Sequence, residues 1–290
     1  MKPAPFDYHR PDSIAEALAL LAANRGRARV LAGGQTLVPA LNQRLDRPSV
    51  LVDINRIPDL DRIELADDMV RVGPLVRQQS LLDALGSGGT AGLSLPLVAA
   101  ALPGVGHIQT RNRGTVVGSI AARDPLAQLP LVALVGGASI TIGRTGSEPR
   151  IEEIDDFLDA VGDAEPHDGL VLSVDFVRAS PDSATAYEEF RHNVLLGAAA
   201  VNLDGGIGRV GFLTGVGRPV LHELDTRQLT EQRSEHSGGQ LRDAASSIVE
   251  SAQFLDDVHA AADYRCALTI ELLSRALGSA MNAVSGDHKA

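Results

Sequence analysis

Two glycine-rich segments contain the residues of this chain that are best suited to binding an anion. The first covers residues 30–44 and reads VLAGGQTLVPALNQR, so that Gly33 and Gly34 precede Gln35 and Thr36. Glycine has no β-carbon, so it adopts positive φ easily and lets a ligand approach the main chain. Free N–H groups at a helix start, together with the helix dipole, favour a bound phosphate. The segment therefore predicts either a phosphate site or a plain strand-to-helix turn that Thr36 caps.

The second glycine-rich segment lies about eighty residues later in the chain. It covers residues 111–130, reads RNRGTVVGSIAARDPLAQLP, and places Gly114 and Gly118 beside the hydroxyl groups of Thr115 and Ser119. Two such loops could hold one diphosphate from two sides. Neither segment has the spacing GxGxxG or GxxxxGK[ST], so neither of the two common nucleotide-binding loops is present in them.

The elements around the first segment predict a small βαβ unit. They are a helix at 14–23, a strand at 30–31, a helix after the glycine turn, and a strand at 50–54. Leu37, Leu41 and Leu45 are spaced four residues apart, which predicts that they form one face of an amphipathic second helix. The letters GxGxxG do occur at 206–211, but they follow Asp204 and Gly205 and lead into a strand, so they predict a hairpin.

The remaining pattern predicts further strands and helices in a mixed α+β protein. A hairpin is expected at 63–65 and 69–72, helices at 81–85, 95–102, 126–135 and 154–157, and strands at 138–142 and 170–176, with loops at 86–92 and 162–169. A linker at 179–183 leads to a three-stranded meander at 184–190, 198–204 and 207–216, and then to helices at 224–232, 239–255 and 262–277. We therefore expect a C-terminal α/β domain with a three-stranded sheet.

Composition and charge exclude several classes of function. The net charge is −11 and no basic block interrupts it, which disfavours binding to the backbone of DNA or RNA. Aromatic residues make up only 3% and tryptophan is absent, so a stacking platform for single strands is not expected. No apolar stretch approaches the roughly twenty residues of a membrane span. The sequence contains neither HExxH nor CxxC, so we expect no metal site.

Cysteine usage bears on compartment and on redox chemistry. Cys266 is the single cysteine of the 290 residues, which excludes an internal disulfide and favours a reducing compartment. The N-terminal residues show no apolar signal-peptide core, so we expect a cytoplasmic protein. One cysteine cannot supply the four thiolates of an iron–sulfur cluster.

Four stretches, taken in order, resemble the medium, FAD-binding subunit of molybdenum hydroxylases, the enzymes of the carbon monoxide dehydrogenase and xanthine dehydrogenase type. The matching residues are 6–21 (FDYHRPDSIAEALALL), 31–44 (LAGGQTLVPALNQR), 108–130 (IQTRNRGTVVGSIAARDPLAQLP) and 257–277 (DVHAAADYRCALTIELLSRAL). The resemblance covers nearly the whole chain, and the four motifs keep the order of the family.

The resemblance implies a fold and a set of partners. The fold would be a two-lobed FAD-binding domain of the p-cresol methylhydroxylase type at 1–177, with lobes of about 1–57 and 58–177, followed by a C-terminal domain at 183–290. The subunit would work beside a large molybdenum-cofactor subunit and a small subunit with two [2Fe–2S] clusters, in a dimer of heterotrimers. Electrons would pass from molybdenum through the clusters to FAD and then to an external acceptor.

The resemblance also implies which residues hold the cofactor. By position, the FAD ligands would be Ala32, Gly33, Gly34, Gln35, Thr36, Thr115, Val116, Val117, Gly118, Ser119, Gln128 and Leu170. No catalytic acid or base is expected, because the flavin itself carries the redox chemistry. If this holds, Val117 should have negative φ and direct its side chain into the protein, because a β-branched residue at positive φ would be strained.

Among the departures from the family pattern, three keep a second interpretation open. Val117 stands where the family has glycine, Gln128 where it has an acid that binds a ribose hydroxyl, and Glu189 near where it has lysine. These departures motivate the alternative of a structural subunit with weak or lost FAD binding. A free-standing flavin oxidase is a third hypothesis, but the sequence shows no convergent set of catalytic residues for it.

Overall fold

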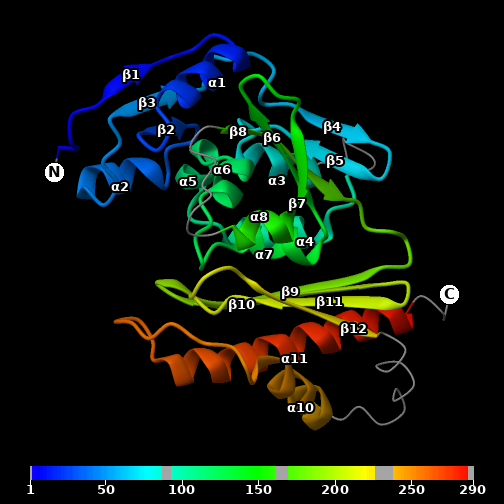
Figure 1. Cartoon of the computed structure of the whole chain (residues 1–290). Helices are drawn as coiled ribbons and strands as arrows, with labels where there is room; N and C mark the ends of the chain where they lie inside the picture. The colour runs from blue at the N-terminus through cyan, green and yellow to red at the C-terminus, as the bar shows by residue number, and fades with distance from the viewer. Residues whose placement is uncertain (1, 87–92, 161–168, 226–237, 287–290) are drawn as a thin grey trace. The chain divides into compact units, whose positions relative to one another are not determined.

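The computed structural model describes residues 2–86, 93–160, 169–225 and 238–286 and has a mixed α/β fold (Figure 1). It divides into two compact units. Unit 1 comprises Met1–Leu93, Val105–Arg123 and Ala138–Val177, and unit 2 comprises Ser94–Gly104, Asp124–Gly137 and Arg178–Ala290. The loops expected at 86–92 and 162–169 lie almost entirely outside the described residues. Among the described residues, no helix is both long and apolar enough to cross a bilayer.

The N-terminal part of unit 1 contains the predicted βαβ arrangement. Its parallel sheet has the order β1-β3-β2, formed by Asp7–His9, Val50–Asp53 and Ala28–Leu31. Helix α2 (Leu37–Gln43) connects β2 to β3. The strand β1 was not predicted, because three residues are too short to show an alternating pattern. The helix expected to run through Leu45 is shorter, because α2 ends at Gln43 and Leu45 is 79% exposed.

Helix α1 (Ile14–Ala23) packs on this sheet and agrees with the predicted range. Its N-cap is Ser13, whose side chain accepts a hydrogen bond from the N–H of Glu16 at 3.2 Å. The buried face of α1 includes Ala17 and Leu21, which join a core with residues of β2 and β3. The helix also contacts β6 and β8, so it joins the small sheet to the second sheet of unit 1.

The second sheet of unit 1 has five antiparallel strands in the order β4-β5-β8-β6-β7. The strands are β4 (Ile63–Ala66), β5 (Met69–Val72), β6 (Ser139–Arg144), β7 (Arg150–Glu153) and β8 (Gly169–Val177). The helices of this part are α3 (Gln78–Gly86), α5 (Ile108–Arg113), α6 (Val116–Ala121) and α8 (Ile154–Asp159). The predicted hairpin of β4 and β5 is confirmed.

Unit 2 is built on a sheet of four antiparallel strands rather than the three that were predicted. Its order is β12-β11-β10-β9, formed by Val220–Asp225, Ile207–Phe212, Val194–Asp204 and Ala184–His192. The fourth strand arises because 220–225 pairs along the whole length of β11, so the helix predicted from residue 224 is wrong at its start. The rest of that predicted helix lies outside the described residues. The hairpin predicted at the GxGxxG letters is confirmed between β10 and β11, with Gly205 at φ +61°.

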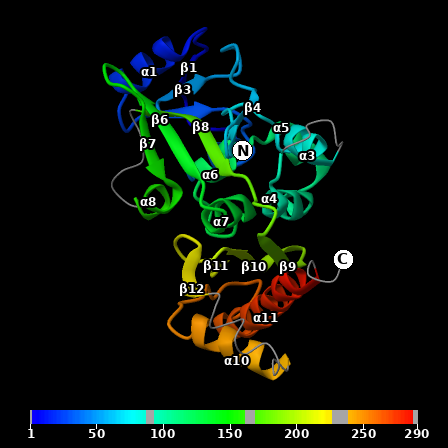
Figure 2. The same cartoon turned by 90° about the vertical axis from the view of Figure 1, so that its right-hand side faces the viewer.

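Helices cover both faces of the unit 2 sheet. On one face lies α11 (Ala262–Gly286), and α10 (Gly238–Val249) packs against α11. On the other face lie α4 (Pro96–Ala101) and α7 (Gln128–Val135) (Figures 1 and 2). The short helix η1 (Leu102–Gly104) contacts α4 and α7. All eight residues of α7 are buried. A β-carbon on Gly211 of β11 would lie 2.5 Å from Val135, so glycine is required for this close packing.

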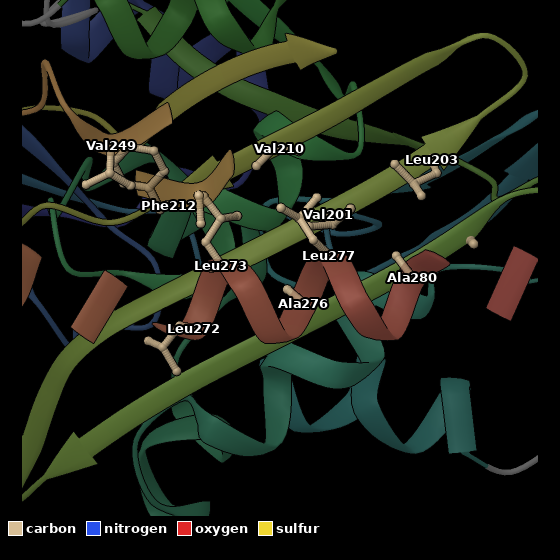
Figure 3. Packing of buried hydrophobic residues seen from close by; sticks show 13 residues of the cluster. Val201, Leu203, Val210, Phe212, Val249, Leu272, Leu273, Ala276, Leu277 and Ala280 are labelled. Atoms are coloured by element: carbon tan, nitrogen blue, oxygen red, sulfur yellow. The ribbon is translucent and has the colours of Figure 1, made fainter. Parts of the chain in front are cut away.

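The two units are not separated by one boundary near residues 177–183, where the predicted domains meet. Segments 94–104 and 124–137 group with the C-terminal residues, since α4 and α7 pack on β9, β10 and β11. The core on the opposite face is formed by β10 and β11 with α10 and α11 (Figure 3). There Leu273, Ala276 and Leu277 of α11 face the sheet and are fully buried. The partly buried Cys266 packs against the same cluster, as its position in a helical pattern indicated.

Candidate functional site

The first glycine-rich segment forms the turn between β2 and α2 of unit 1. Gly34 has φ +72°, the left-handed conformation that favours glycine. Thr36 occupies the N-cap position of α2, but its side chain makes no capping hydrogen bond. The alternative of a turn capped by the Thr36 hydroxyl is therefore wrong. That hydroxyl is exposed and remains available to a ligand.

Main-chain donors are concentrated in this turn. Within the described part of the chain, no acceptor faces the N–H groups of Gly33, Gly34, Gln35 and Thr36. The Gln35 side chain donates back to the Gly33 carbonyl at 3.4 Å, and the Ala32 carbonyl is already an acceptor within the protein. The residues predicted from the sequence thus supply a row of N–H donors, which is the chemistry that binds an anion at the main chain.

The second glycine-rich segment starts helix α6. The Thr115 side chain is the N-cap and accepts from the N–H of Gly118 at 3.0 Å. Val116 donates its N–H to the Val76 carbonyl, and Ser119 continues the helix with a bond to the Thr115 carbonyl. Val117 lies within α6, has helical φ and is 2% exposed, which confirms that its side chain points into the protein.

The tertiary fold brings the two glycine-rich segments into direct contact. A β-carbon on Gly33 would lie 2.4 Å from the carbonyl oxygen of Arg113 and 3.0 Å from the nitrogen of Thr115. No side chain fits at that distance, so only glycine lets the two main chains meet. The two glycine-rich segments therefore lie side by side in unit 1, and their approach to one ligand stays a prediction. The N–H donors of the first segment are what a diphosphate needs.

Two residues that the sequence did not single out link these segments. Asn55 donates its side-chain N–H to the carbonyl of Ala32 at 2.9 Å, and Arg77 donates to the carbonyl of Arg113 at 2.6 Å. Arg77 also donates to the side-chain oxygen of Asn55 at 2.8 Å. A signal for Asn55 was present, because it follows β3, and the carboxyl ends of parallel strands β2 and β3 meet at one sheet edge. Arg77 gave no such signal, since its contact with the second segment is set by tertiary packing.

Asp53 holds Asn55 in place through hydrogen bonds. Its carboxylate accepts from the main-chain N–H of Asn55 at 2.9 Å, from the Asn55 side chain and from the hydroxyl of Tyr8, with Arg10 3.6 Å away. Burial by itself would raise the pKa of Asp53, but the hydrogen bonds from Tyr8 and Asn55 outweigh it and lower that pKa. The same Tyr8–Asp53 bond raises the pKa of the Tyr8 hydroxyl. Asp53 therefore stays ionised and Tyr8 neutral at pH 7.

Arg77 carries its charge in a partly buried position. Burial lowers the pKa of Arg77, and the neighbouring positive charge of Arg113 lowers it further. The hydrogen-bond acceptors of its guanidinium among the described residues are two neutral oxygens. Its positive charge is thus not neutralised by a carboxylate in direct contact, which favours an anion near the two segments.

Gln128 lies in unit 2, at the start of α7. Its side-chain N–H group donates to the Gly104 carbonyl at 2.9 Å and to the Glu189 carboxylate at 3.2 Å. Both partners can only accept, so the orientation of the Gln128 amide is fixed and its carbonyl oxygen is left as the acceptor. Glu189 also accepts from Tyr187 at 2.7 Å and pairs with Arg191. Burial, followed by the charge of Glu189, raises the pKa of Tyr187.

Leu170 lies on β8 in unit 1. Its side chain is 3% exposed and belongs to the core beneath α1. Its role as a cofactor ligand stays a prediction, as does that of Gln128. Among the described residues, no group of three His, Cys, Asp or Glu side chains is placed to hold a metal ion.

Comparison with known proteins places this arrangement in a family. Residues 4–176 match the family described as the FAD binding domain in molybdopterin dehydrogenase. The chain is 33% identical to the 6-hydroxypseudooxynicotine dehydrogenase complex subunit alpha of Paenarthrobacter nicotinovorans, over 97% of this chain and 96% of that protein. It is 28% identical to the carbon monoxide dehydrogenase medium chain of Hydrogenophaga pseudoflava, over 97% and 98%.

A solved structure gives the same result. The carbon monoxide dehydrogenase from Hydrogenophaga pseudoflava that lacks the Mo-pyranopterin moiety of its cofactor contains a chain that superposes with a TM-score of 0.83 at 25% identity. The superposition covers 97% of this chain and 99% of that chain. The sequence resemblance, the family match over 4–176 and the shared fold agree. The chain therefore belongs to the molybdopterin dehydrogenase FAD-binding family, as a medium subunit of the molybdenum hydroxylase type.

Proposed function

We propose that this chain is the electron-transfer subunit of a molybdenum-containing hydroxylase or dehydrogenase. When bound, FAD supplies the redox chemistry, accepting electrons from [2Fe–2S] clusters of a partner subunit and releasing them to an external acceptor. The protein's own contribution is to bind and orient the cofactor. The observation that carries this proposal is the contact between the two glycine-rich segments at Gly33 and Arg113, in a chain of an FAD-binding family.

The proposed diphosphate ligands come from both segments. In the first, the N–H groups of residues 33–36 and the Thr36 hydroxyl would donate to phosphate oxygens. In the second, residues 115–119 contribute through the start of α6. Thr115 is committed to capping Gly118, so its hydroxyl shapes this segment rather than reaching freely for a ligand. Gln128, through its carbonyl oxygen, is the proposed acceptor for a ribose hydroxyl.

The assembly that we propose follows the family pattern. A large molybdenum-cofactor subunit and a small [2Fe–2S] subunit complete a heterotrimer, which pairs into a dimer of heterotrimers in the cytoplasm. The FAD-binding domain is the two-lobed p-cresol methylhydroxylase type at 1–177, with the C-terminal domain at 183–290. The lone Cys266 supports the need for a cluster-bearing partner, because one thiolate cannot hold such a cluster.

A second candidate function is a structural subunit that has weak or lost FAD binding. Gln128 favours it. Its amide nitrogen is bonded to Glu189, so a ribose hydroxyl would meet the neutral carbonyl oxygen of Gln128, without the charge assistance that a carboxylate gives. Glu189 also places negative charge where the resemblance expects lysine. The absorbance spectrum of the purified chain separates the two functions. Bound oxidised flavin near one per chain supports the first, and a colourless chain that does not take up added FAD contradicts it.

The substitution Gly34→Val tests the placement of the cofactor. Valine at φ +72° is strained by roughly 1–3 kcal/mol, and its β-carbon would contact Val38 and Leu31 at 3.1 and 3.2 Å. We expect loss of bound flavin, measured as the flavin-to-protein absorbance ratio. The matched control is Gly26→Val, which has φ +74° and no neighbour within 4 Å, so it adds the same kind of strain away from the segment. Full flavin occupancy in Gly34→Val would contradict the placement.

A further inference from the structure

Among the described residues, no main-chain hydrogen bond joins the two glycine-rich segments. The two main chains touch where Gly33 meets Arg113 and Thr115. The connection across this contact runs instead through two side chains, those of Asn55 and Arg77. In order, the Ala32 carbonyl accepts from Asn55, the Asn55 side-chain oxygen accepts from Arg77, and Arg77 donates to the Arg113 carbonyl.

We propose that Asn55 and Arg77 are positioning residues that set the spacing between the two glycine-rich segments and thereby the fit of the FAD diphosphate. This inference rests on the proposed function for the identity of the ligand. The link itself consists of three hydrogen bonds of 2.6–2.9 Å between named atoms of unit 1.

The chemistry of the link leaves one orientation for each side chain. A guanidinium only donates and a carbonyl only accepts, so Arg77 must meet the oxygen of the Asn55 amide, and the nitrogen of that amide must face the Ala32 carbonyl. The Asn55 nitrogen also donates to Asp53 at 2.7 Å, and the Asn55 main chain donates to the same carboxylate at 2.9 Å. Asn55 is therefore held from both sides, and cannot rotate without losing several bonds.

Arginine is needed at 77 because the two acceptors are reached by different nitrogens. Nη1 donates to the Arg113 carbonyl and Nη2 to Asn55. Lysine keeps the charge but has one nitrogen, so it does not reproduce the planar fork. The substitution Arg77→Lys therefore separates a positioning role, which it removes, from a purely electrostatic role, which it preserves. Asn55→Ala removes the other half of the link.

The first measurement is made on the full chain without FAD. Hydrogen exchange of main-chain amides should become faster over 32–36 and 113–119 in Arg77→Lys and in Asn55→Ala, because the link no longer restrains these segments. The control is Arg62→Lys, which alters an exposed arginine that pairs with Asp59 on the surface of the same unit. Exchange rates like those of the unmodified chain in both Arg77→Lys and Asn55→Ala would overturn the proposal.

The second measurement is the dissociation constant for FAD, from quenching of flavin fluorescence. We expect each variant to weaken binding on the order of tenfold, about 1.4 kcal/mol. The double variant should bind FAD about as weakly as whichever single variant binds it less tightly, because both substitutions act through one link. Wild-type affinity in Arg77→Lys, together with weak binding in Arg77→Met, would assign Arg77 a charge role only and overturn the link. If the unmodified chain binds no FAD but the exchange result holds, the proposed function fails and the link stands.

Discussion

Gly33 and Gly34 are adjacent residues that need glycine for different reasons. At Gly33 the limit is space, since a β-carbon would lie 2.4 Å from the Arg113 carbonyl oxygen. At Gly34 the limit is the backbone angle, which is φ +72°. The first constraint joins two distant parts of the chain, and the second shapes the turn before α2. The two adjacent glycines are therefore required for two separate physical reasons.

The substitution Val117→Gly is a prediction at this scale. Val117 is buried within α6, so removing its side chain loses about 1.5–3 kcal/mol of burial, and glycine within a helix costs about 1 kcal/mol more. We expect the free energy of unfolding in urea to fall by roughly 2–4 kcal/mol. FAD affinity should not improve, because the side chain already points into the protein.

The control for this stability change is Val38→Gly in α2. Val38 is 42% exposed, so this variant introduces glycine into a helix but removes less buried apolar surface than Val117→Gly does. A gain of tenfold or more in FAD affinity for Val117→Gly would show that valine obstructs the site. That result would favour a subunit that is losing its flavin.

The two glycine-rich segments continue into helices α2 and α6 in different ways. Both helices are short, so packing and caps must stabilise them rather than helix propensity. Helix α6 has a side-chain cap at Thr115, and α2 has none at Thr36. The two threonines therefore form a natural comparison between a capping and a non-capping hydroxyl.

We expect Thr115→Val to lower the free energy of unfolding by about 1 kcal/mol, within the usual range for a lost N-cap. Valine keeps the shape of the 3% exposed side chain but leaves the N–H of Gly118 without its acceptor. Thr115→Ser should retain most of the stability. Thr36→Val is the matched control and should cost less, because that hydroxyl caps nothing. Equal losses in Thr115→Val and Thr36→Val would contradict the capping role.

The loop before α11 has a pH-dependent contribution to stability. Burial alone would raise the pKa of Asp257, but bonds from the N–H of Ala260, from Arg265 and from the N–H of His259 lower it to about 2. An ordinary Asp has a pKa of about 3.9 when unfolded. The stabilisation is therefore complete above about pH 4 and is lost as the pH falls towards 2.

Asp257→Asn tests this linkage through the difference in unfolding free energy from the unmodified chain. We expect the difference to be largest above pH 4 and to shrink between pH 4 and 2, as Asp257 becomes protonated in the unmodified chain. The neighbouring Asp256→Asn serves as the comparison variant, because it leaves the hydrogen bond between Arg265 and Asp257 in place. A difference that is independent of pH across this range would exclude the proposed role of Asp257 beside the buried Arg265.

At the scale of the whole molecule, the family likeness extends over both compact units. The match to the Hydrogenophaga pseudoflava chain covers 97% of this chain, whereas the FAD-binding family region covers residues 4–176. Unit 2 combines its C-terminal strands with α4 and α7 from the middle of the sequence. The chain thus enters unit 2 twice before it reaches the C-terminal sheet.

We predict that the chain purified from its native host is part of a larger complex. Because its single cysteine cannot hold an iron–sulfur cluster, a cysteine-rich small subunit and a large subunit should copurify with it. Size-exclusion chromatography with mass spectrometry of the peak checks this. A chain that elutes only as an active monomer would contradict the assembly.

The sequence determined the local elements and the chemistry of the first segment. The helix predicted at 14–23 and the hairpin predicted at 63–65 and 69–72 are both present, because such elements depend on neighbouring residues. It also identified both glycine-rich segments, since glycine beside hydroxyl residues is visible in the letters. The family resemblance then supplied their role as expected ligands of FAD.

The tertiary structure decided the rest, because those features depend on contacts between distant residues. Strand β12 forms through its pairing with β11, although its letters suggested the start of a helix. Helix α7 is apolar on all sides, so no periodicity indicated that it packs on the sheet of unit 2. The contact of Gly33 with Arg113, and the link through Asn55 and Arg77, join residues 22–80 positions apart, which only the folded chain brings together.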